Sequence, residues 1–377
     1  MMELEKIKVI AINTGFGFTK CMIAQGRKQW QYYTMPSALA YPDGQDIQEE
    51  EIHQNFLIKY GLLFGEDAIA SRNPSIPKLT DRADVLYFEE GARFLNERMK
   101  AKIFGPMAIG LHEFYPDETE HEMILTLCIP PDHIQYKKAI AADVVGEHTI
   151  CLQGRTDLKV NVVKCFVLAE TYAGLTSQEL RYVGPGLPIK QNKEFLTQTT
   201  IVINAGCYTF DVTAFYPRTD LHGIRKLKSG HPQSRRWGNW SLLPQIKSHI
   251  LQKYNDRIMN LSDWQLMEIL EKKEIPGKLP VKLAKEFREF FEQRSHAIID
   301  LISQVAEQYP STHRILLVGG GWHDYKEFIL DAPEFKHIPV IEIGKGKDDD
   351  DMHPEECVPY GMFTYTRRYY DVLVEQQ

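Results

Sequence analysis

The chain has 377 residues, of which 43% are hydrophobic and 25% are charged, the composition of an ordinary folded protein whose length suits two domains. Its formal net charge of −7 argues against a general affinity for nucleic acid or for an anionic membrane. A local basic patch is still compatible with that charge, and the sequence has one at Arg225, Lys226, Lys228, Arg235 and Arg236.

The cysteines and the apolar runs predict the compartment. The six cysteines are far apart, form no C-x-x-C pair, and several lie inside apolar runs. This pattern indicates buried free thiols in a reducing compartment. No apolar stretch reaches the ~18 residues that a membrane span requires, and the N-terminus lacks a signal-peptide pattern. We therefore expect a cytoplasmic protein with no membrane partner.

The first predicted element is a β-hairpin. The mostly apolar run from Ile7 to Ile12 ends in Asn13-Thr14-Gly15-Phe16-Gly17, which indicates a strand that stops in a glycine-bearing turn. Lys20 to Ala24 then read as the returning strand. A Rossmann or P-loop site would place a helix directly after its glycines, and neither glycine motif occurs in the sequence.

A second hairpin is predicted in the middle of the chain. A helix is expected from Phe166 to Leu180, with Glu170 in its first turns. The β-branched run Thr200–Ile203 follows, and then the turn Asn204-Ala205-Gly206-Cys207-Tyr208-Thr209 and a returning strand from Phe210 to Phe215. The two hairpins lie about 190 residues apart, which points to a duplicated domain.

The remaining predictions run to the C-terminus. The basic, Pro-, Gly- and Ser-rich segment Pro217–Gly238 is predicted to be a surface connection. Pro280–Gln308 has the apolar spacing of an amphipathic helix, a strand leads into Gly319-Gly320-Gly321, and Pro359–Val374 is predicted to be helical. The run Lys345–Asp351 ends in four carboxylates that could hold a hard cation, but a solvated loop is favoured because adjacent side chains rarely converge on one ion.

The glycine-bearing turns are the candidate chemistry. Backbone N–H groups in two such turns can hold a triphosphate, with glycine allowing close approach and Thr hydroxyls adding donors. The candidates are Asn13–Lys20 and Asn204–Asp211. Each turn alone is a weak signal, because most glycine-bearing hairpin turns are only turns.

The order of these features is more specific. First turn, acidic helix start, second turn and glycine run after a strand resemble the actin superfamily, which includes actin, heat-shock chaperone ATPases and sugar kinases. Ala11–Lys20 matches its first phosphate pattern, Glu170 its connecting-helix acid, and Leu317–Gly321 its adenosine motif. Asn204, Gly206, Thr209 and Asp211 match its second phosphate pattern in part.

Within this superfamily the likeness is closest to the bacterial and archaeal actin-like proteins typified by ParM, the plasmid-segregation filament. The chain length supports this branch, as do four further segments: Met35–Ala38, Phe64–Ala68, Cys128–Pro131 and Pro359–Met362. The resemblance implies an α/β, actin-like (ribonuclease H-like) fold of duplicated domains, with two lobes around a nucleotide cleft.

The same resemblance implies domain boundaries. The first lobe would span 1–178 and 357–377, with a small upper subdomain at about 37–105. The second lobe would span 179–356, with its small upper subdomain at about 238–308.

Roles for individual residues also follow from the resemblance. Glu170 would orient the water that attacks the γ-phosphate, with Asp211 as a second, water-polarising acid. An ordinary helix-start acid and an ordinary strand-end carboxylate are the alternatives for these two residues. The nucleotide, ATP or GTP with Mg²⁺, would be held by Asn13, Thr14, Gly15, Gly17, Thr19, Lys20, Asn204, Gly206, Thr209, Gly319, Gly320 and Gly321.

Two positions depart from the family pattern. The family usually has aspartate where this chain has Asn13 and Asn204, and the carboxylates hold waters of the bound magnesium. Asparagine keeps an acceptor oxygen but loses the charge, which at an effective dielectric of about 20 weakens the attraction by on the order of a few kcal/mol. Asn13, Asn204 and Asp211 would then contact the metal weakly and through water, and we expect slow hydrolysis.

The function predicted from the sequence is a nucleotide-driven filament, a weak triphosphatase, that serves plasmid or DNA segregation or another cytoskeletal task. The expected partners are further copies of the chain and a DNA-binding adaptor, without direct nucleic-acid binding. Ser71–Pro77 and Trp237–Trp240 are candidates for filament contacts, with core packing as the alternative for the tryptophans. A non-hydrolysing nucleotide-binding scaffold and, more remotely, a phosphotransferase remain open.

Overall fold

The computed structural model describes residues 4–15, 17–37, 39–40, 63–64, 97–151, 156–219, 225–254, 263–275, 280–342 and 353–376. Its contacts divide the chain into two compact units. Among the described residues, the second unit takes Leu196–Glu355, and the first takes those up to Phe195 and from Glu356 onward. Three segments that carry predictions, 65–68, 71–77 and 345–351, lie outside the described residues.

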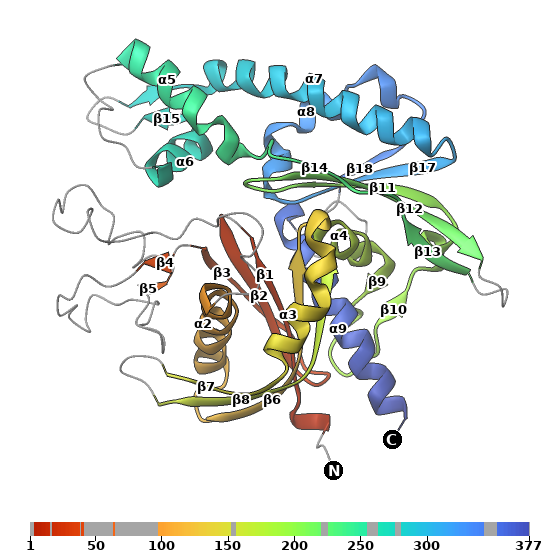
Figure 1. The fold of residues 1–377 in the computed structure, drawn as a ribbon. Coiled ribbons are helices and arrows are strands. Elements are labelled where there is room, and N and C mark those ends of the chain that lie inside the picture. The colour runs from red at the N-terminus through yellow and green to blue at the C-terminus, as the bar shows by residue number, and fades with distance from the viewer. Residues whose placement is uncertain are drawn as a thin grey trace. The chain divides into compact units, whose positions relative to one another are not determined.

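A six-stranded sheet forms the centre of the first unit (Figure 1). β1, β6 and β8 are parallel to one another, and the remaining pairs are antiparallel. Every residue of β1 from Lys8 to Ile12 is buried, as expected of a central strand covered on both faces. In spatial order the strands are β3 (Gln31–Pro36), β2 (Phe18–Gln25), β1 (Lys8–Thr14), β6 (Glu120–Ile129), β8 (Leu158–Ala169) and β7 (Gly146–Ile150).

Helices cover both faces of this sheet. α2 (Glu97–Phe114) and α3 (Lys137–Val144) share a hydrophobic cluster with alternate residues of β1 and β6, Ile10, Ile12, Leu125 and Leu127 among them. Thr126 points to the opposite face, where it accepts a hydrogen bond of 2.6 Å from Thr366 of α9 (Cys357–Glu375). α9 packs in turn on α4 (Glu170–Glu179).

The predicted helix Phe166–Leu180 is wrong in its first part. Residues through Ala169 continue β8, which pairs in parallel with β6, and the helix begins only at Glu170. The β-branched residues of β8, such as Val160, Val162 and Val167, favour the strand and outweigh the helical spacing that begins at Phe166. The predicted C-terminal helix is confirmed, and it begins two residues earlier than expected, at Cys357.

The second unit has its own six-stranded sheet. β11 and β12 form the predicted antiparallel hairpin, and β17 and β18 pair in parallel beside β11. The strands are β13 (Arg225–Ser229), β12 (Phe210–Thr219), β11 (Thr199–Ala205), β17 (Thr312–Val318) and β18 (Val340–Glu342), with β14 (Gln233–Arg235) also pairing with β12. Both units thus place a parallel partner next to an antiparallel hairpin.

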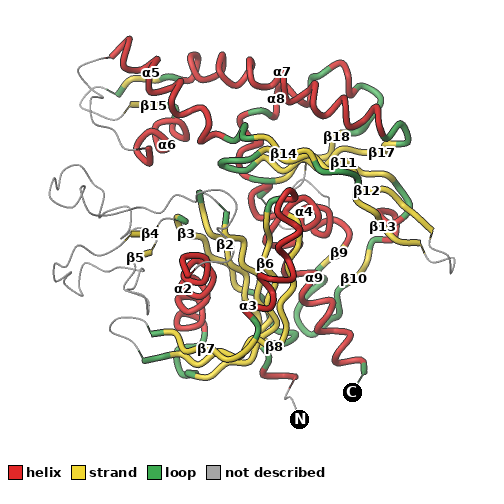
Figure 2. Tube along the Cα trace, viewed as in Figure 1, coloured by secondary structure: helices red, strands yellow, loops and turns green. Residues whose placement is uncertain are grey.

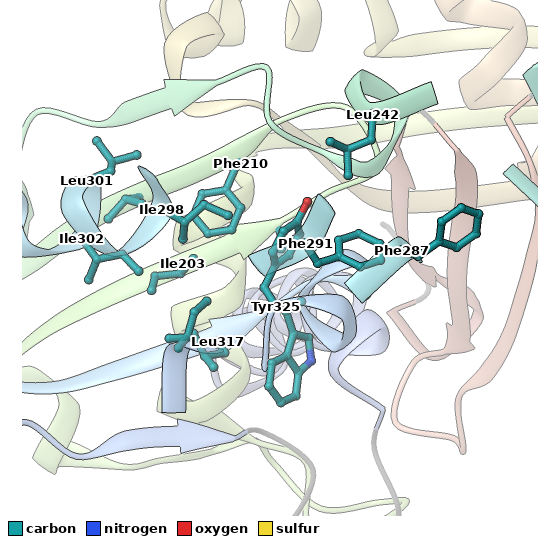
Figure 3. Close-up of a cluster of buried hydrophobic side chains, with 14 of the residues drawn as sticks. Ile203, Phe210, Leu242, Phe287, Phe291, Ile298, Leu301, Ile302, Leu317 and Tyr325 are labelled. Carbon is teal, nitrogen blue, oxygen red and sulfur yellow. The ribbon is translucent and has the colours of Figure 1, made fainter. Parts of the chain in front are cut away.

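The amphipathic helix α7 (Ala284–Gln308) packs on one face of the second sheet, as its spacing predicts. It begins later than the predicted Pro280, because Val281 and Lys282 instead pair as a short strand with Ile275 and Glu274. Figure 3 shows Phe287, Phe291 and Ile298 of α7 in one buried cluster with Phe210 of β12 and Leu317 of β17. Other helices of this unit are α5 (Leu243–Tyr254), α6 (Asp263–Lys272) and α8 (Lys326–Leu330). The short strand pairs of the chain are β4–β5 (Leu39–Ala40, Leu63–Phe64), β9–β10 (Leu180–Arg181, Lys190–Gln191) and β15–β16 (Glu274–Ile275, Val281–Lys282).

The predicted surface connection Pro217–Gly238 is also corrected. Within it β12 runs on to Thr219, and β13 and β14 both pair with β12. Pro217 is compatible with this strand because β11 pairs with β12 only as far as Phe215, so no N–H is required of it on that side. Sheet pairing overrides the loop-like composition here.

The cysteines have the burial that their apolar surroundings in the sequence predict for most of them. All six cysteines are free, and Cys21, Cys128, Cys165 and Cys357 are buried, whereas Cys151 and Cys207 are half-buried. Burial raises the pKa of the Cys21 and Cys165 thiols to about 12, so both are held as unreactive thiols.

Within the described ranges, no helix combines the length and apolar character that crossing a membrane requires.

Candidate functional site

The first candidate turn closes the β1–β2 hairpin. Its last strand pair is Thr14–Thr19, and Asn13 lies opposite Lys20. A Cβ on Gly15 would lie 2.8 Å from the Phe18 carbonyl oxygen, so the tight turn itself requires glycine at this position.

Two groups at this turn differ in how they are used. The Thr19 side chain is fully buried, and its hydroxyl lies 2.8 Å from that of Ser37, whose N–H donates to the Gly17 carbonyl. Thr19 thus supports the turn from inside the unit. Asn13 is different, because its Oδ1 is buried and has no hydrogen-bond partner among the described residues. An unpaired amide oxygen below a glycine turn suits a ligand that brings a donor or a hydrated cation.

Glu170 lies at the same edge of the first sheet as this turn. Ile12, Leu127 and Val167 form one row across the parallel strands β1, β6 and β8. Glu170 is the first residue of α4, three positions beyond Val167, and it is half-buried. With neighbouring strands about 4.8 Å apart, Asn13 and Glu170 are separated by about 10 Å along this edge. Ligands in open α/β sheets bind at such carboxyl ends.

The close packing of α4 on α9 sets the position of Glu170. A Cβ on Gly361 of α9 would lie only 1.8 Å from the Ala173 carbonyl oxygen of α4. The two backbones therefore approach as closely as glycine permits, and α4 has little freedom to shift.

The second candidate turn closes the β11–β12 hairpin. The Gly206 N–H donates to the Thr209 carbonyl at 2.9 Å, and Asn204 lies opposite Asp211. The Asp211 carboxylate is completely buried and accepts hydrogen bonds from the hydroxyls of Thr209 and Ser234. Asp211 thus orders this turn and links it to β14, a use that sequence reasoning did not predict.

The structure explains two of the three glycines that follow β17. Gly319 has a φ of +93°, and its Cβ would lie 2.5 Å from the Ala205 carbonyl oxygen, so the fold requires glycine there. Gly321 is tight, at 3.1 Å from the same oxygen. A Cβ on Gly320 would meet only Glu355, at 3.4 Å or more, which is ordinary contact distance. The described fold gives no reason for glycine at 320.

The two loops of the second unit lie side by side. Asn204 and Val318 are partners in the parallel pair β11–β17, so the second turn and the glycine run both leave the carboxyl edge of this sheet. The Asn204 Oδ1 would lie 2.7 Å from a Cβ on Gly319, which places the amide next to the first glycine of the run. All predicted residues of this unit are therefore at one edge.

Sequence reasoning missed a segment that packs on the second turn. Gly238 N–H donates to the Tyr208 carbonyl at 3.0 Å and Trp240 N–H to the Cys207 carbonyl at 2.8 Å. The signal in the sequence is the glycine at 238. The structure requires it, because a Cβ there would lie 2.4 Å from the Cys207 carbonyl oxygen. Trp237 and Trp240 pack against the core of the unit, as the core-packing alternative predicts.

A half-buried acid follows the glycine run. Asp324 accepts a 2.7 Å hydrogen bond from Asn239 and lies 3.4 Å from the Lys273 ammonium. Burial raises the pKa of Asp324, and Lys273 opposes that rise. Lys273 is the one described non-glycine residue with positive φ, at 53°, which indicates a backbone held in place by its surroundings.

A dedicated metal cage is not among these features. Across the part of the chain that the structure describes, no group of three or more His, Cys, Asp or Glu side chains is placed to hold a metal ion. The groups at the turns that could meet a hydrated cation are the amides of Asn13 and Asn204.

No family model matches the sequence, and no curated protein matches it significantly. Solved structures do match over almost the whole chain. A 15-stranded ParM filament from Clostridium botulinum is 16% identical, with a TM-score of 0.67 over 96% of this chain and 99% of that one. The actin-like protein Alp7A is 11% identical, with a TM-score of 0.67 over 97% of each chain.

A third match is Bacillus thuringiensis ParM with ATP, 14% identical, with a TM-score of 0.62 over 98% of this chain and 99% of that one. This chain has the actin-like fold, in its ParM-like form. The α/β, actin-like fold class implied by the resemblance is thereby confirmed. At these identities the actin-like fold is shared, and the residues at the turns have to be argued from their own geometry.

Proposed function

We propose that this actin-like chain binds a purine nucleoside triphosphate with Mg²⁺, ATP or GTP, and assembles with further copies of itself into filaments in the cytoplasm. Hydrolysis of the nucleotide would be slow. Plasmid or DNA segregation through a DNA-binding adaptor is the task that the likeness to ParM suggests.

The observation that carries nucleotide binding is the bare backbone at Gly320. The backbone conformation or close contacts explain Gly319 and Gly321, but Gly320 has room for a side chain. A flat nucleoside that lies against the backbone of Gly320 would account for the glycine, because any Cβ at this position would hold the nucleoside away from the backbone. The ParM with ATP that shares this fold supports the same ligand class.

Phosphate binding is proposed for both turns. In the first unit, the backbone at Thr14, Gly15 and Gly17, with Lys20 on the returning strand, would contact the β- and γ-phosphates, and Thr19 would support the turn. In the second unit, Gly206 and Thr209 would supply further phosphate contacts. Such turns supply N–H donors without competing side chains. Glu170 would orient the attacking water.

Metal binding is proposed to be weak. Mg²⁺ keeps several waters and binds mainly through the phosphates, so it requires little from the protein. The unpaired Oδ1 of Asn13 and the amide of Asn204 would accept hydrogen bonds from metal-bound water. Asp211 would act on the same waters while it keeps its two hydroxyl donors, since a carboxylate can accept more than two hydrogen bonds. A carboxylate would attract the cation more strongly than either amide, which supports slow turnover.

Assembly is tested by sedimentation and light scattering over a range of protein concentrations, with ATP, GTP and a non-hydrolysable analogue, together with timed phosphate release. We expect the protein to pellet only with nucleotide, and we expect the amount that pellets to change with the amount of phosphate released. A protein that binds nucleotide but stays monomeric at every concentration would exclude the filament.

One alternative has a specific observation in its favour. The two asparagines at the turns suit a non-hydrolysing scaffold whose nucleotide serves only to stabilise it. Assembly with equal filament lifetime in ATP and in the analogue, without phosphate release, would establish that alternative. Rapid phosphate transfer to a small-molecule acceptor would instead establish the phosphotransferase.

A further inference from the structure

Two strands of the second unit continue past the rest of their sheet. β11 pairs with β12 only as far as Thr200–Phe215, whereas β12 and β13 remain paired from Phe215–Ser229 to Thr219–Arg225. Residues 216–219 and 225–228 therefore form a two-stranded antiparallel ribbon, here called the basic ribbon. It is visible in Figures 1 and 2 where β12 and β13 run on beyond β11.

The basic side chains of this ribbon share one face. Arg218 lies opposite Lys226 and Tyr216 opposite Lys228, and cross-strand partners point to the same side of a sheet. Arg218, Lys226 and Lys228 are exposed. Tyr216 marks the end of the core on this face, because its ring stacks on Tyr309 with centroids 5.4 Å apart.

The structure divides the basic patch that the sequence suggested. Arg235 pairs with Phe210 at the opposite end of β12, and its guanidinium donates to the Ser234 carbonyl and to the Gln233 side chain. Arg235 is thus far from the ribbon. Arg236 follows it in the chain, with its guanidinium over the Tyr208 ring. The basic residues at the projecting end are Arg218, Arg225, Lys226 and Lys228.

The cross-strand pairing places cations together at this face. Arg218 and Lys226 are direct partners, so one anion can contact both side chains. Lys226 and Lys228 repeat the charge at about 7 Å along the strand, the spacing of alternate residues. A regular row of cations suits a polymer with regularly spaced anions better than it suits an irregular acidic protein surface.

We propose that the basic ribbon binds the phosphate backbone of duplex DNA. A two-stranded β-ribbon has the width that the major groove admits, and Lys and Arg contacts to phosphate require no base sequence. The net charge of −7 opposes DNA binding by the molecule as a whole, so contact is confined to this projecting face. This inference goes beyond the proposed nucleotide and filament function and modifies the expectation of no direct nucleic-acid binding.

The test uses the full chain without nucleotide and a short labelled duplex of mixed sequence, followed by fluorescence anisotropy between about 50 and about 200 mM salt. The ribbon variant is Lys226→Glu with Lys228→Glu. The matched control is Lys282→Glu with Lys285→Glu, two exposed lysines of the same unit outside the ribbon. Each pair changes the net charge from −7 by the same four units.

We expect the wild type and the control to bind alike, with log K falling with log salt at a slope of about −0.9 for each phosphate contacted. The ribbon variant should bind at least about tenfold more weakly at about 50 mM salt. Lys226→Gln with Lys228→Gln should reduce the slope by about 2 without the added repulsion.

Equal loss in the ribbon variant and the control would overturn the proposal, because it would indicate a net-charge effect. Absence of duplex binding by the wild type at the lowest salt would also overturn it. Competition by poly-glutamate as strong as by unlabelled duplex would assign the ribbon to an acidic protein partner instead. The thermal midpoints and the nucleotide-dependent pelleting of all variants are measured as well. If both are unchanged, a result on DNA binding concerns the ribbon alone and is separate from failure of the proposed nucleotide and filament function.

Discussion

Asn204 and Asp211 are direct partners across the β11–β12 hairpin, and both side chains are buried. Only one member of the pair, Asp211, has an ionisable side chain. The Asp211 carboxylate already accepts two hydroxyl hydrogen bonds, so the amide opposite it avoids a second buried carboxylate. This arrangement explains how the unit tolerates a buried acid at its candidate phosphate turn.

Restoring both acids gives the first prediction. In Asn13→Asp with Asn204→Asp, repulsion from Asp211 should lower the stability of the nucleotide-free protein by about 1 kcal/mol. Mg-nucleotide should restore the thermal midpoint, sharpen the Mg²⁺ requirement and raise phosphate release. The control, Asn192→Asp with Gln252→Glu, adds the same charge at exposed positions. If Mg²⁺ dependence and release stay at wild-type values, these positions do not face the metal.

Substitutions at Gly320 and Gly319 should affect nucleotide binding and folding separately. Gly320→Ala has room in the fold, so its unfolding free energy should stay within about 0.5 kcal/mol of wild type. Its affinity for a fluorescent ATP analogue should fall about tenfold or more, about 1.4 kcal/mol, and further for Gly320→Val. Gly319→Ala should instead destabilise the protein by about 1–3 kcal/mol, because its φ is +93°. Unchanged binding in Gly320→Val would remove the nucleoside from this site.

Glu170 is tested against the second acid of its own helix. Glu170→Gln should slow phosphate release by about a hundredfold, leave assembly intact and lengthen filament lifetime, because ordered water is lost while the phosphate contacts remain. Glu179 is buried, and its carboxylate accepts a 2.8 Å hydrogen bond from Gln191. Glu179→Gln should change the thermal midpoint and not the release rate. Equal slowing in both variants would refute a specific role for Glu170.

A buried histidine in the first unit predicts the acid sensitivity of the fold. Burial, and then the nearby Lys8, lower the pKa of His121 below its usual 6.5, while Glu118 opposes this and His112 adds a further small decrease. Tyr115 packs edge-on against the His121 ring. The unfolded chain therefore binds a proton more readily, and the unfolding free energy should fall as the pH drops below about 6.5.

Denaturant unfolding of His121→Gln should show a weaker loss between about pH 6.5 and pH 5 than the wild type. His231→Gln, at an exposed position, is the control and should follow the wild type. Identical pH profiles for all three proteins would contradict a contribution from His121.

Local pattern alone was sufficient for several elements. The β1–β2 and β11–β12 hairpins, α7 and α9 lie where periodicity and glycine turns predict them, because each pattern reflects local backbone geometry and a single buried face. The fold class was predicted from the resemblance to the actin superfamily that the order of the glycine turns carries. The start of α4 and the strands around Pro217 could not be predicted, since they depend on pairing with distant strands.

The sequence by itself determined which residues stand at the turns: the glycines, the asparagines at 13 and 204, and Glu170. Only the tertiary structure decided how they are used. It made Gly319 a backbone requirement, left Gly320 with space for a Cβ, and turned Asp211 into an internal acceptor for two hydroxyls. The physical reason is that a residue's role depends on which atoms oppose it across the sheet, and those atoms come from parts of the chain far away in sequence.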